Sequence, residues 1–332
     1  MKLVRLAFVA MVAGGPALAQ ESPSFNCAKA TTPVERTICA RPELAKADRE
    51  MAAAYAALNA KIDGSAKDHA LKDQTRWLLN RNKICAGNEE EIARCLGERY
   101  QARTGNLAML AEDTYPFVST QSRFSTGRVG RIGYKFDASW PQFDDKAVDF
   151  AELNRSFVVI ADKAAQEVIP TRQTPGAGDR DQVWFYSQDF TLQRPSVDSV
   201  AVAVIASSYT GGAHGYRGTT AYLVDLRKGS LAEPRDVFVK GDGWLDLLTP
   251  LVRADLLKQF VEKPGFEDLI EPKRLAKMLR DPSLYYFRRD ALELIFNPYV
   301  VGPYVSGPFS VLVPYATLKP LLSAEGPLAS LR

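Results

Sequence analysis

The sequence predicts an α+β protein that is built in two parts. All four cysteines lie in the first third of the chain, together with the segments that have helical periodicity. Segments typical of β-strands begin only after residue 113. We therefore expect a disulfide-tied helical hairpin or three-helix domain over residues 20–113, followed by a mixed α+β domain with an antiparallel sheet over residues 114–332.

The N-terminus has the features of a secretory signal peptide. Positive charges at Lys2 and Arg5 precede a short apolar run over 6–13 and an Ala-Leu-Ala cleavage motif at 17–19. An apolar run of this length is too short to cross a bilayer, which needs about 20 residues. We therefore expect a periplasmic or secreted protein that has no membrane span and is soluble once residues 1–19 are removed.

The spacing of the cysteines favours two disulfides over a zinc site. Structural zinc ligands usually lie roughly two to four residues apart, and no pair among Cys27, Cys39, Cys85 and Cys95 is that close. An oxidising compartment allows an even set of thiols to pair. Three connectivities are possible in principle, and helix geometry favours the two local ones, Cys27 with Cys39 and Cys85 with Cys95.

Three segments of the first part carry apolar residues at three- and four-residue steps, which is the period of an amphipathic helix. The first begins at Pro42, a residue that suits the first position of a helix, and ends at the break IDGSAKD. The second runs from about residue 68 to 83. The third follows the sequence CAGN and runs from residue 89 to 110.

The composition changes after residue 113. YPFVSTQSRFSTGRVGR lacks helical period and is rich in Ser, Thr and Gly, so we expect a domain boundary near 113–125. Strand signals follow in RIGYKFDASW, FVVIAD, QVWFYSQDFTL, SVAVAVIASSYT and TTAYLVDL. DLRKGSL predicts a tight hairpin turn with positive φ at Gly229. Helices are expected at 243–260 and 271–279, and a strand and then a short helix at 309–322.

The stretch SYTGGAHGY places Ser208 and His214 on either side of a glycine pair, in a chain with two histidines. A serine nucleophile needs a base that a third group orients, and this stretch lacks the G-x-S-x-G pattern of a nucleophile elbow. The glycines fit better as a turn between two strands. His214 would then bond a loop carbonyl or contact a partner. We expect no catalytic residue and no enzyme activity.

Metal, cofactor and nucleic-acid binding are not predicted. His69 and His214 are too few for a histidine-rich metal centre, and no EF-hand pattern occurs. The net charge is +3, to which the N-terminal segment contributes Lys2 and Arg5. A nucleic-acid partner normally demands a strongly basic face, which this balance does not supply.

Three stretches of the first part share a residue pattern with a known family. CAKATTPVERTICARPELAKADREMAAAY carries the pattern at Cys27, Glu35, Ile38, Cys39, Leu44, Asp48 and Tyr55. QTRWLLNRNKIC and CLGERYQARTGNL continue it at Gln74, Trp77, Arg81, Cys85, Cys95, Leu96, Tyr100 and Arg103. This pattern resembles the N-terminal domain of the LprI lysozyme-inhibitor family, over residues 27 to about 110. The resemblance implies recognition of lysozyme.

The second part carries a glycine-rich turn followed by a hairpin, SYTGGAHGYRGTTAYLVDLRKGSL, and ends in PYVVGPYVSGPFSVLVPYATLKPLL. Over about residues 120–325 it resembles the extracellular domain of the anti-sigma factor RsiV and the accessory domain of the deacetylase PdaC. Because the RsiV ectodomain binds lysozyme, this resemblance also implies lysozyme recognition. We expect neither signalling nor deacetylation, since the sequence has no sigma-binding segment, membrane helix or deacetylase domain.

Two surfaces are candidates for partner binding, because aromatic and arginine side chains are favoured at interface hot spots. The candidate residues are Tyr209, His214 and Tyr216 in the glycine-rich loop, and Trp77 and Arg81 on the second helix. For the helical pair an alternative stays open. Trp77 could pack inside the helical hairpin while Arg81 pairs with an acid such as Asp48.

The expected function is that of an exported envelope binding protein that binds and inhibits lysozyme-type muramidases. Its partner would be lysozyme or another peptidoglycan-active protein. A glycoside hydrolase of this kind works with two carboxylates in a cleft, which an inhibitor need only occlude. The alternative is a cell-wall-associated accessory or stress protein that binds glycan or another envelope protein. A third possibility, a hydrolase, rests only on Ser208 and His214.

Overall fold

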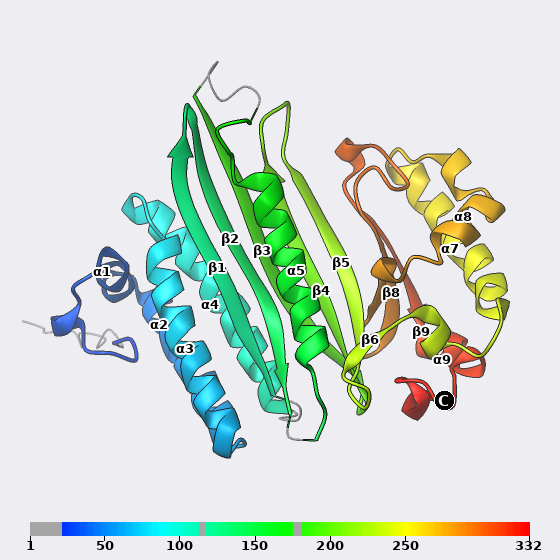
Figure 1. Cartoon of the computed structure of the whole chain (residues 1–332), viewed down its shortest axis with the longest axis horizontal. Coiled ribbons are helices and arrows are strands. Elements are labelled where there is room, and N and C mark those ends of the chain that lie inside the picture. Colours follow the sequence, from blue (N-terminus) through cyan, green and yellow to red (C-terminus); the bar gives the residue numbers. More distant parts are fainter. Residues whose placement is uncertain (1–21, 113–116, 146, 175–180) are drawn as a thin grey trace, which may run out of the picture.

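The structure, a computed structural model, describes residues 22–112, 117–145, 147–174 and 181–332. The predicted signal peptide lies outside the described residues. Figure 1 shows helices α1–α4 at one side of a central six-stranded sheet, with α5 across a face of that sheet. A three-stranded sheet and the remaining helices lie at the other side. The predicted class, a disulfide-tied helical region followed by an α+β domain, is confirmed.

The helical part begins with a short 3₁₀ turn and continues as four helices, one more than the three expected. Their bounds are η1 Cys27–Lys29, α1 Pro33–Ala40, α2 Pro42–Asn59, α3 Gly64–Ile84 and α4 Glu89–Glu112. A capping box starts α1: the Glu35 N–H donates to the Thr32 hydroxyl at 3.1 Å, and the Thr32 N–H donates to the Glu35 carboxylate at 2.9 Å. Pro42 occupies the first turn of α2, as the sequence predicts.

Both disulfides have the predicted local pairing. Cys27–Cys39 ties η1 to the end of α1, and Cys85–Cys95 ties the end of α3 to α4. Each closes a short loop at a corner where one helical element gives way to the next. The two links therefore restrain the connections of the helical part.

The large sheet has the order β1-β2-β3-β4-β5-β6. Its strands are β1 Phe117–Val129, β2 Ile132–Asp144, β3 Gln182–Ser196, β4 Ser199–Tyr209, β5 Tyr216–Asp225 and β6 Ser230–Ala232. All neighbours are antiparallel except β2 and β3, which are parallel. A parallel pair needs a crossover, and α5, Ala151–Val168, supplies it. Gly229, at φ 66°, makes the predicted turn from β5 into β6.

The remaining elements form a smaller antiparallel sheet, ordered β7-β8-β9, and its covering helices. The longer elements are α6 Pro234–Val237, α7 Gly243–Glu262, α8 Pro272–Met278, β7 Tyr285–Phe287, β8 Ala291–Phe296, β9 Phe309–Pro314 and α9 Tyr315–Leu318. Short 3₁₀ turns are η2 Glu267–Ile270, η3 Pro282–Leu284, η4 Tyr304–Ser306, η5 Lys319–Leu321 and η6 Ala329–Leu331. Within the described ranges, no helix is both long and apolar enough to span a membrane.

Two segments differ from their sequence prediction. FVVIAD, expected as a strand, lies in α5, because residues such as Phe157 and Ala161 are spaced to face the sheet while Val159 points to solvent. Residues 117–129, which overlap the boundary expected near 113–125, form β1 and pair with β2 along their whole length. Ser and Thr fit an edge strand whose outer face is exposed, so their abundance hides the strand signal. Strands β7 and β8 were not predicted.

The apolar core runs without a break from the helical part into the large sheet. One cluster of buried side chains includes Leu96 and Tyr100 of α4, Phe136 of β2 and Phe157 of α5. A second cluster joins the opposite side of β4 and β5 to the small sheet. The helices thus pack directly on the sheet, and the division of the chain at 113/114 into two domains stays a prediction.

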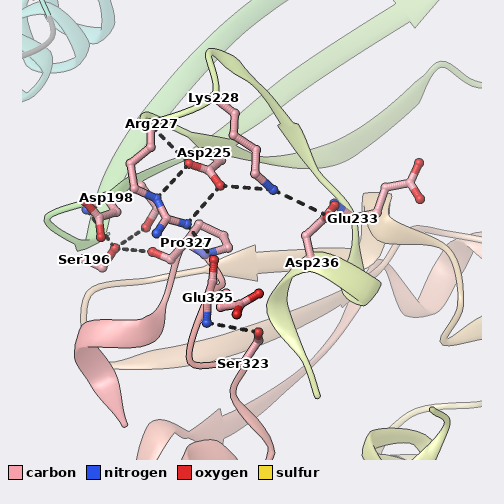
Figure 2. A network of polar contacts seen from close by, with 11 residues as sticks. Ser196, Asp198, Asp225, Arg227, Lys228, Glu233, Asp236, Ser323, Glu325 and Pro327 are labelled. Atoms are coloured by element: carbon pink, nitrogen blue, oxygen red, sulfur yellow. Dashed lines mark hydrogen bonds and ion pairs between the residues drawn. The ribbon is translucent and has the colours of Figure 1, made fainter. Parts of the chain in front are cut away.

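A polar cluster holds the end of the chain against the large sheet (Figure 2). Asp225, at the end of β5, is 1% exposed and accepts hydrogen bonds from the backbone and side chain of Arg227. The Arg227 guanidinium also donates to the Glu325 carbonyl at 2.9 Å. On the neighbouring turn, the Ser196 hydroxyl donates to the Pro327 carbonyl at 2.5 Å. Because Asp225 and Arg227 bond each other and Arg227 also bonds the Glu325 backbone, this cluster fits a structural role.

Candidate functional site

The glycine-rich stretch forms the loop between β4 and β5. Ser208 and Tyr216 are opposite each other in the ladder, and Gly211 and Gly212 turn the chain at φ 95° and 96°. A residue with a Cβ rarely adopts such angles. The predicted turn is therefore confirmed.

His214 is exposed in this loop, and neither of its ring nitrogens is directed at Ser208. Nδ1 lies 2.8 Å from the Gly215 carbonyl oxygen, and Nε2 lies 3.1 Å from the hydroxyl of Tyr299. Its ring stacks on Tyr304, with centroids 3.9 Å apart and planes at 17°. A serine nucleophile would need this base within hydrogen-bond reach. The arrangement gives His214 a place in an aromatic cluster instead.

Tyr299 lies in a tight turn between β8 and β9. The Val300 N–H donates to the Asn297 carbonyl at 3.0 Å, which places Pro298 and Tyr299 at the centre of the turn. Tyr299 has φ 73° and is the one non-glycine residue with positive φ in the described part of the chain. Glycine or asparagine normally occupies such a position, because a Cβ there costs about 1–2 kcal/mol. A large exposed ring at a strained position points to a functional constraint.

The side chain of Asn297 fixes this turn beside the β4–β5 loop. Its Nδ2 donates to the Thr219 carbonyl at 2.8 Å, and its Oδ1 accepts from the Thr219 N–H at 2.8 Å. The carboxamide thus pairs with β5 in the way that a neighbouring strand would. Two loops that are far apart in sequence are therefore held together by a specific contact.

The aromatic cluster consists of His214, Tyr299 and Tyr304. Tyr304 lies 5.7 Å from Tyr299 between ring centroids, and Tyr299 is 53% exposed. Val305, next to the cluster in sequence, is 86% exposed. Exposed rings that are held in place by their neighbours lose little entropy on binding, which is typical of hot spots in protein interfaces.

Of the three loop residues predicted to bind a partner, only His214 belongs to this cluster. The Tyr209 hydroxyl donates to the Gly212 carbonyl at 3.2 Å, and its ring stacks with Phe185, so it supports the loop. Tyr216 is 43% exposed, and its ring covers Gly218, where a Cβ would collide with it. Sequence reasoning missed Tyr299 and Tyr304. The signal that could have found them is PYVVGPYVSG, where two tyrosines stand among turn residues.

The second predicted surface is largely buried. Arg81 is 5% exposed and donates to the Tyr100 hydroxyl at 2.6 Å, and that hydroxyl donates to Asp48 at 2.7 Å. Arg81 and Asp48 also form an ion pair at 3.8 Å. Burial raises the pKa of Tyr100 far above its usual range. Arg81 therefore has the internal partner Asp48, as in the alternative left open by the sequence, and a contact of Arg81 with another protein stays a prediction.

Trp77 lies half-buried beside this network. The guanidinium groups of Arg81 and Arg103 lie 5.6 and 5.9 Å from its ring centre. Arg103 pairs with Asp73 at 2.8 Å, and Asp73 accepts from the Thr120 N–H of β1 at 3.1 Å. Burial raises the pKa of the Asp73 carboxyl. These residues join the helices to one another and to the sheet.

A cavity of about 330 Å³ opens beside the Arg81 network and is lined by several residues of the shared sequence pattern. Glu35 is one of them, and the backbone N–H groups of Thr32 and Thr31 bond its carboxylate and lower its pKa. Gln74 is another, and it bonds Arg103 and the Met51 sulfur. Glu35, Gln74 and Arg81 at this cavity thus have internal partners, which fits a role of the pattern in the fold of the helical part.

Comparison with protein families gives two matches. Residues 27–107 match the family described as lysozyme inhibitor LprI, and residues 235–316 match a family described as a protein of unknown function, DUF3298. The first match confirms the resemblance seen in the helical part. The second covers part of the segment for which a separate domain is expected.

Two solved structures are similar to this chain. One is a member of the DUF3298 family from Bacteroides fragilis, with 14% identity and a TM-score of 0.43 over 65% of this chain and 98% of that chain. The other is a DUF3298 family protein from Pseudomonas aeruginosa, with 15% identity and a TM-score of 0.43 over 63% of this chain and 95% of that chain. No curated protein sequence matches.

Proposed function

We propose that this chain, in which an LprI-type helical domain precedes a DUF3298-type segment, is an exported envelope protein that binds and inhibits a lysozyme-type muramidase. The observation that carries the proposal is the match of residues 27–107 to a family described as a lysozyme inhibitor. Export rests on the predicted signal peptide over 1–19. The two disulfides support it, because such bonds persist in oxidising compartments.

The aromatic cluster is the surface that we assign to the contact. The rings of His214 and Tyr299 are exposed and that of Tyr304 is half-buried, and Asn297 and the glycine turn hold their two loops in place. Preorganised rings of this kind bind with a small entropic cost. A muramidase acts through two carboxylates in a cleft, so rings that enter this cleft would block the glycan without any chemistry.

The helical part offers one competing contact surface. Leu71 and Leu79 lie on α3 and are 60% and 58% exposed. They are eight residues apart and therefore share one side of the helix. The function test must separate this pair from the aromatic cluster.

The test measures binding of a lysozyme to the full chain by isothermal titration calorimetry, with muramidase activity assayed in parallel. The double variant His214→Ala/Tyr299→Gly should weaken the Kd about 30-fold, which corresponds to about 2 kcal/mol. Leu71→Ser/Leu79→Ser is the matched control and should bind normally. Loss of binding in the control alone would move the contact to α3. The absence of any binding by the wild-type chain would contradict the proposed function.

The second candidate is the accessory protein that binds glycan. The aromatic cluster supports this candidate too, because flat rings can also pack against sugar faces. Titration with a soluble glycan oligomer in the absence of lysozyme separates the two. Glycan binding that is lost in His214→Ala/Tyr299→Gly, without any lysozyme binding, would establish this alternative.

A further inference from the structure

A cavity of about 180 Å³ opens beside β5 and β6, and no residue of the aromatic cluster lines it. Its walls come from these two strands and from α6, η3 and β7. An apolar cavity of about 150 Å³ is large enough to hold benzene. The volume therefore fits one aromatic ring.

The walls of this cavity include a buried apolar surface. Val237, Tyr285 and Phe287 are 1%, 2% and 3% exposed, whereas Leu231 is 37% exposed. The rings of Tyr285 and Phe287 stack with centroids 6.1 Å apart and planes at 27°. The Tyr285 hydroxyl donates to the Leu279 carbonyl at 2.5 Å, so it has an internal partner. These residues give a bound ring an apolar and aromatic surface to pack against.

Three further polar side chains line the cavity, and they differ in their partners. The Glu233 carboxylate forms an ion pair with Arg235 at 2.8 Å. The hydroxyls of Tyr222 and Ser283 have no hydrogen-bond partner among the residues that the structure describes. The cavity therefore offers a hydroxyl group next to its apolar surface.

Of these two hydroxyls, that of Ser283 is the better placed. Ala221 and Leu223 belong to the core between the two sheets, so Tyr222, which lies between them in β5, directs its ring to the other face. There the Tyr222 ring meets Phe157 of α5 edge-on, with centroids 5.5 Å apart. Ser283 is half-buried in η3, and its side chain makes no such contact. A polar group of a ligand would therefore meet Ser283 first.

The charges around the cavity favour an uncharged ligand. Glu233 lines the cavity, and Asp281 lies directly before η3, where it accepts the Ser283 N–H at 2.9 Å. Two carboxylates disfavour an anion. Both are exposed, and Glu233 is already paired with Arg235, so water and this partner weaken their attraction for a cation.

We propose that this cavity binds a small, uncharged aromatic molecule that carries one hydroxyl group. The ring packs against Tyr285, Phe287 and Val237, and the hydroxyl forms a hydrogen bond with the side chain of Ser283. This site is separate from the surface assigned to the muramidase, so each proposal can fail without the other.

The class of ligand is tested on the full chain by ligand-observed NMR and calorimetry. Benzyl alcohol is the probe, and benzoate and benzylamine have nearly the same shape but carry a charge. Benzyl alcohol should bind at least about tenfold more tightly than benzoate and no more weakly than benzylamine. Tighter binding of either charged compound, or no binding of benzyl alcohol at millimolar concentration, would overturn the proposal.

The role of Ser283 is tested with toluene, which has the ring but no hydroxyl. Ser283→Ala should bind benzyl alcohol about three- to tenfold more weakly than the wild type does, since one hydrogen bond is lost, and should bind toluene as well as the wild type does. Tyr222→Phe removes the other free hydroxyl and is the matched control, in which both compounds should bind normally. Loss of benzyl alcohol affinity in Tyr222→Phe alone, or equal losses for both compounds in Ser283→Ala, would refute the hydrogen bond to Ser283.

A further variant checks the location. Leu231→Trp fills the cavity, and Leu312→Trp, on β9, is the control at an exposed leucine that does not line it. Benzyl alcohol binding should be lost in the first variant and kept in the second. If Leu231→Trp lowers the melting temperature, Ser283→Trp replaces it. Retained binding in a folded variant of this kind would place benzyl alcohol elsewhere and refute the site.

Discussion

Replacement of Tyr299 by glycine and by alanine separates the function of this residue from its backbone strain. Both changes remove the ring from the aromatic cluster, whereas only glycine also removes the Cβ that is strained at φ 73°. At an ordinary position glycine is less stable than alanine by about 0.5–1 kcal/mol. At Tyr299 the strain of about 1–2 kcal/mol acts in the opposite direction and is the larger effect.

We therefore expect Tyr299→Gly to be more stable than Tyr299→Ala by about 0.5–1 kcal/mol. In a domain of about 200 residues this is a difference of roughly 1–4 °C in the melting temperature. Relative to wild type, the glycine variant should change little, because the lost contacts of a ring that is 53% exposed offset the relief of strain. Both variants should weaken lysozyme binding to the same degree.

Calorimetric or fluorimetric melting of the three proteins, together with titration of lysozyme, measures all of these effects. The reasoning fails if Tyr299→Ala is the more stable variant, since the backbone would then not be strained. It also fails if both variants bind lysozyme as tightly as the wild type does, since the Tyr299 ring would then contribute nothing to binding that explains its strained backbone.

Three further changes test the account of stability. Tyr100→Phe removes the hydroxyl between Arg81 and Asp48, so the unfolding free energy in guanidinium titrations should fall by about 2 kcal/mol, and an unchanged value would mean that water replaces the bond. Reduction of the two disulfides should lower it by about 3 kcal/mol for each closed loop, seen as a lower denaturation midpoint; equal midpoints would contradict their structural role. Asp137 lies on β2 and forms an ion pair with Arg99, and burial raises the pKa of its carboxyl above the unfolded value. The stability that this carboxyl contributes is therefore present in full below about pH 4 and is lost as the pH rises through the folded pKa. In Asp137→Asn the unfolding free energy should lack this decrease with rising pH. Parallel pH profiles of the unfolding free energy for the variant and the wild type would refute the prediction.

The helical part could be predicted from the sequence because the signals that specify its helices lie within short segments of the chain. The helices α2, α3 and α4 each carry an apolar face with helical period, and each disulfide joins residues that are close in sequence. Strands β2 to β5 were equally clear, since each has a run of alternating or continuous apolar residues. Local patterns of this kind decide the element type wherever one face is buried.

The secondary-structure predictions are wrong where tertiary contacts decide the element type. The run at 157–162 has β-branched residues that favour a strand, yet the face of Phe157 and Ala161 packs on the sheet as part of a helix. Strand β1 has no apolar alternation of its own and exists because β2 pairs with it. The pairing partner supplies a constraint that no window of sequence contains.

The candidate site was predicted only in part for the same reason. His214 stood out because histidine is rare in this chain. Its partners Tyr299 and Tyr304 come from the turn after β8, 85 and 90 positions away. The contact depends on the pairing of Asn297 with Thr219, which no local pattern reports.

Hydrogen–deuterium exchange of the full chain, with and without an excess of lysozyme, tests the central claim most directly. We expect slower exchange in peptides that cover 209–216 and 297–307, because both loops of the aromatic cluster would be covered by the partner. Exchange in α3 should not change. Protection that is confined to α3, or no protection anywhere at a lysozyme concentration well above the measured Kd, would contradict the assignment of the contact to the aromatic cluster.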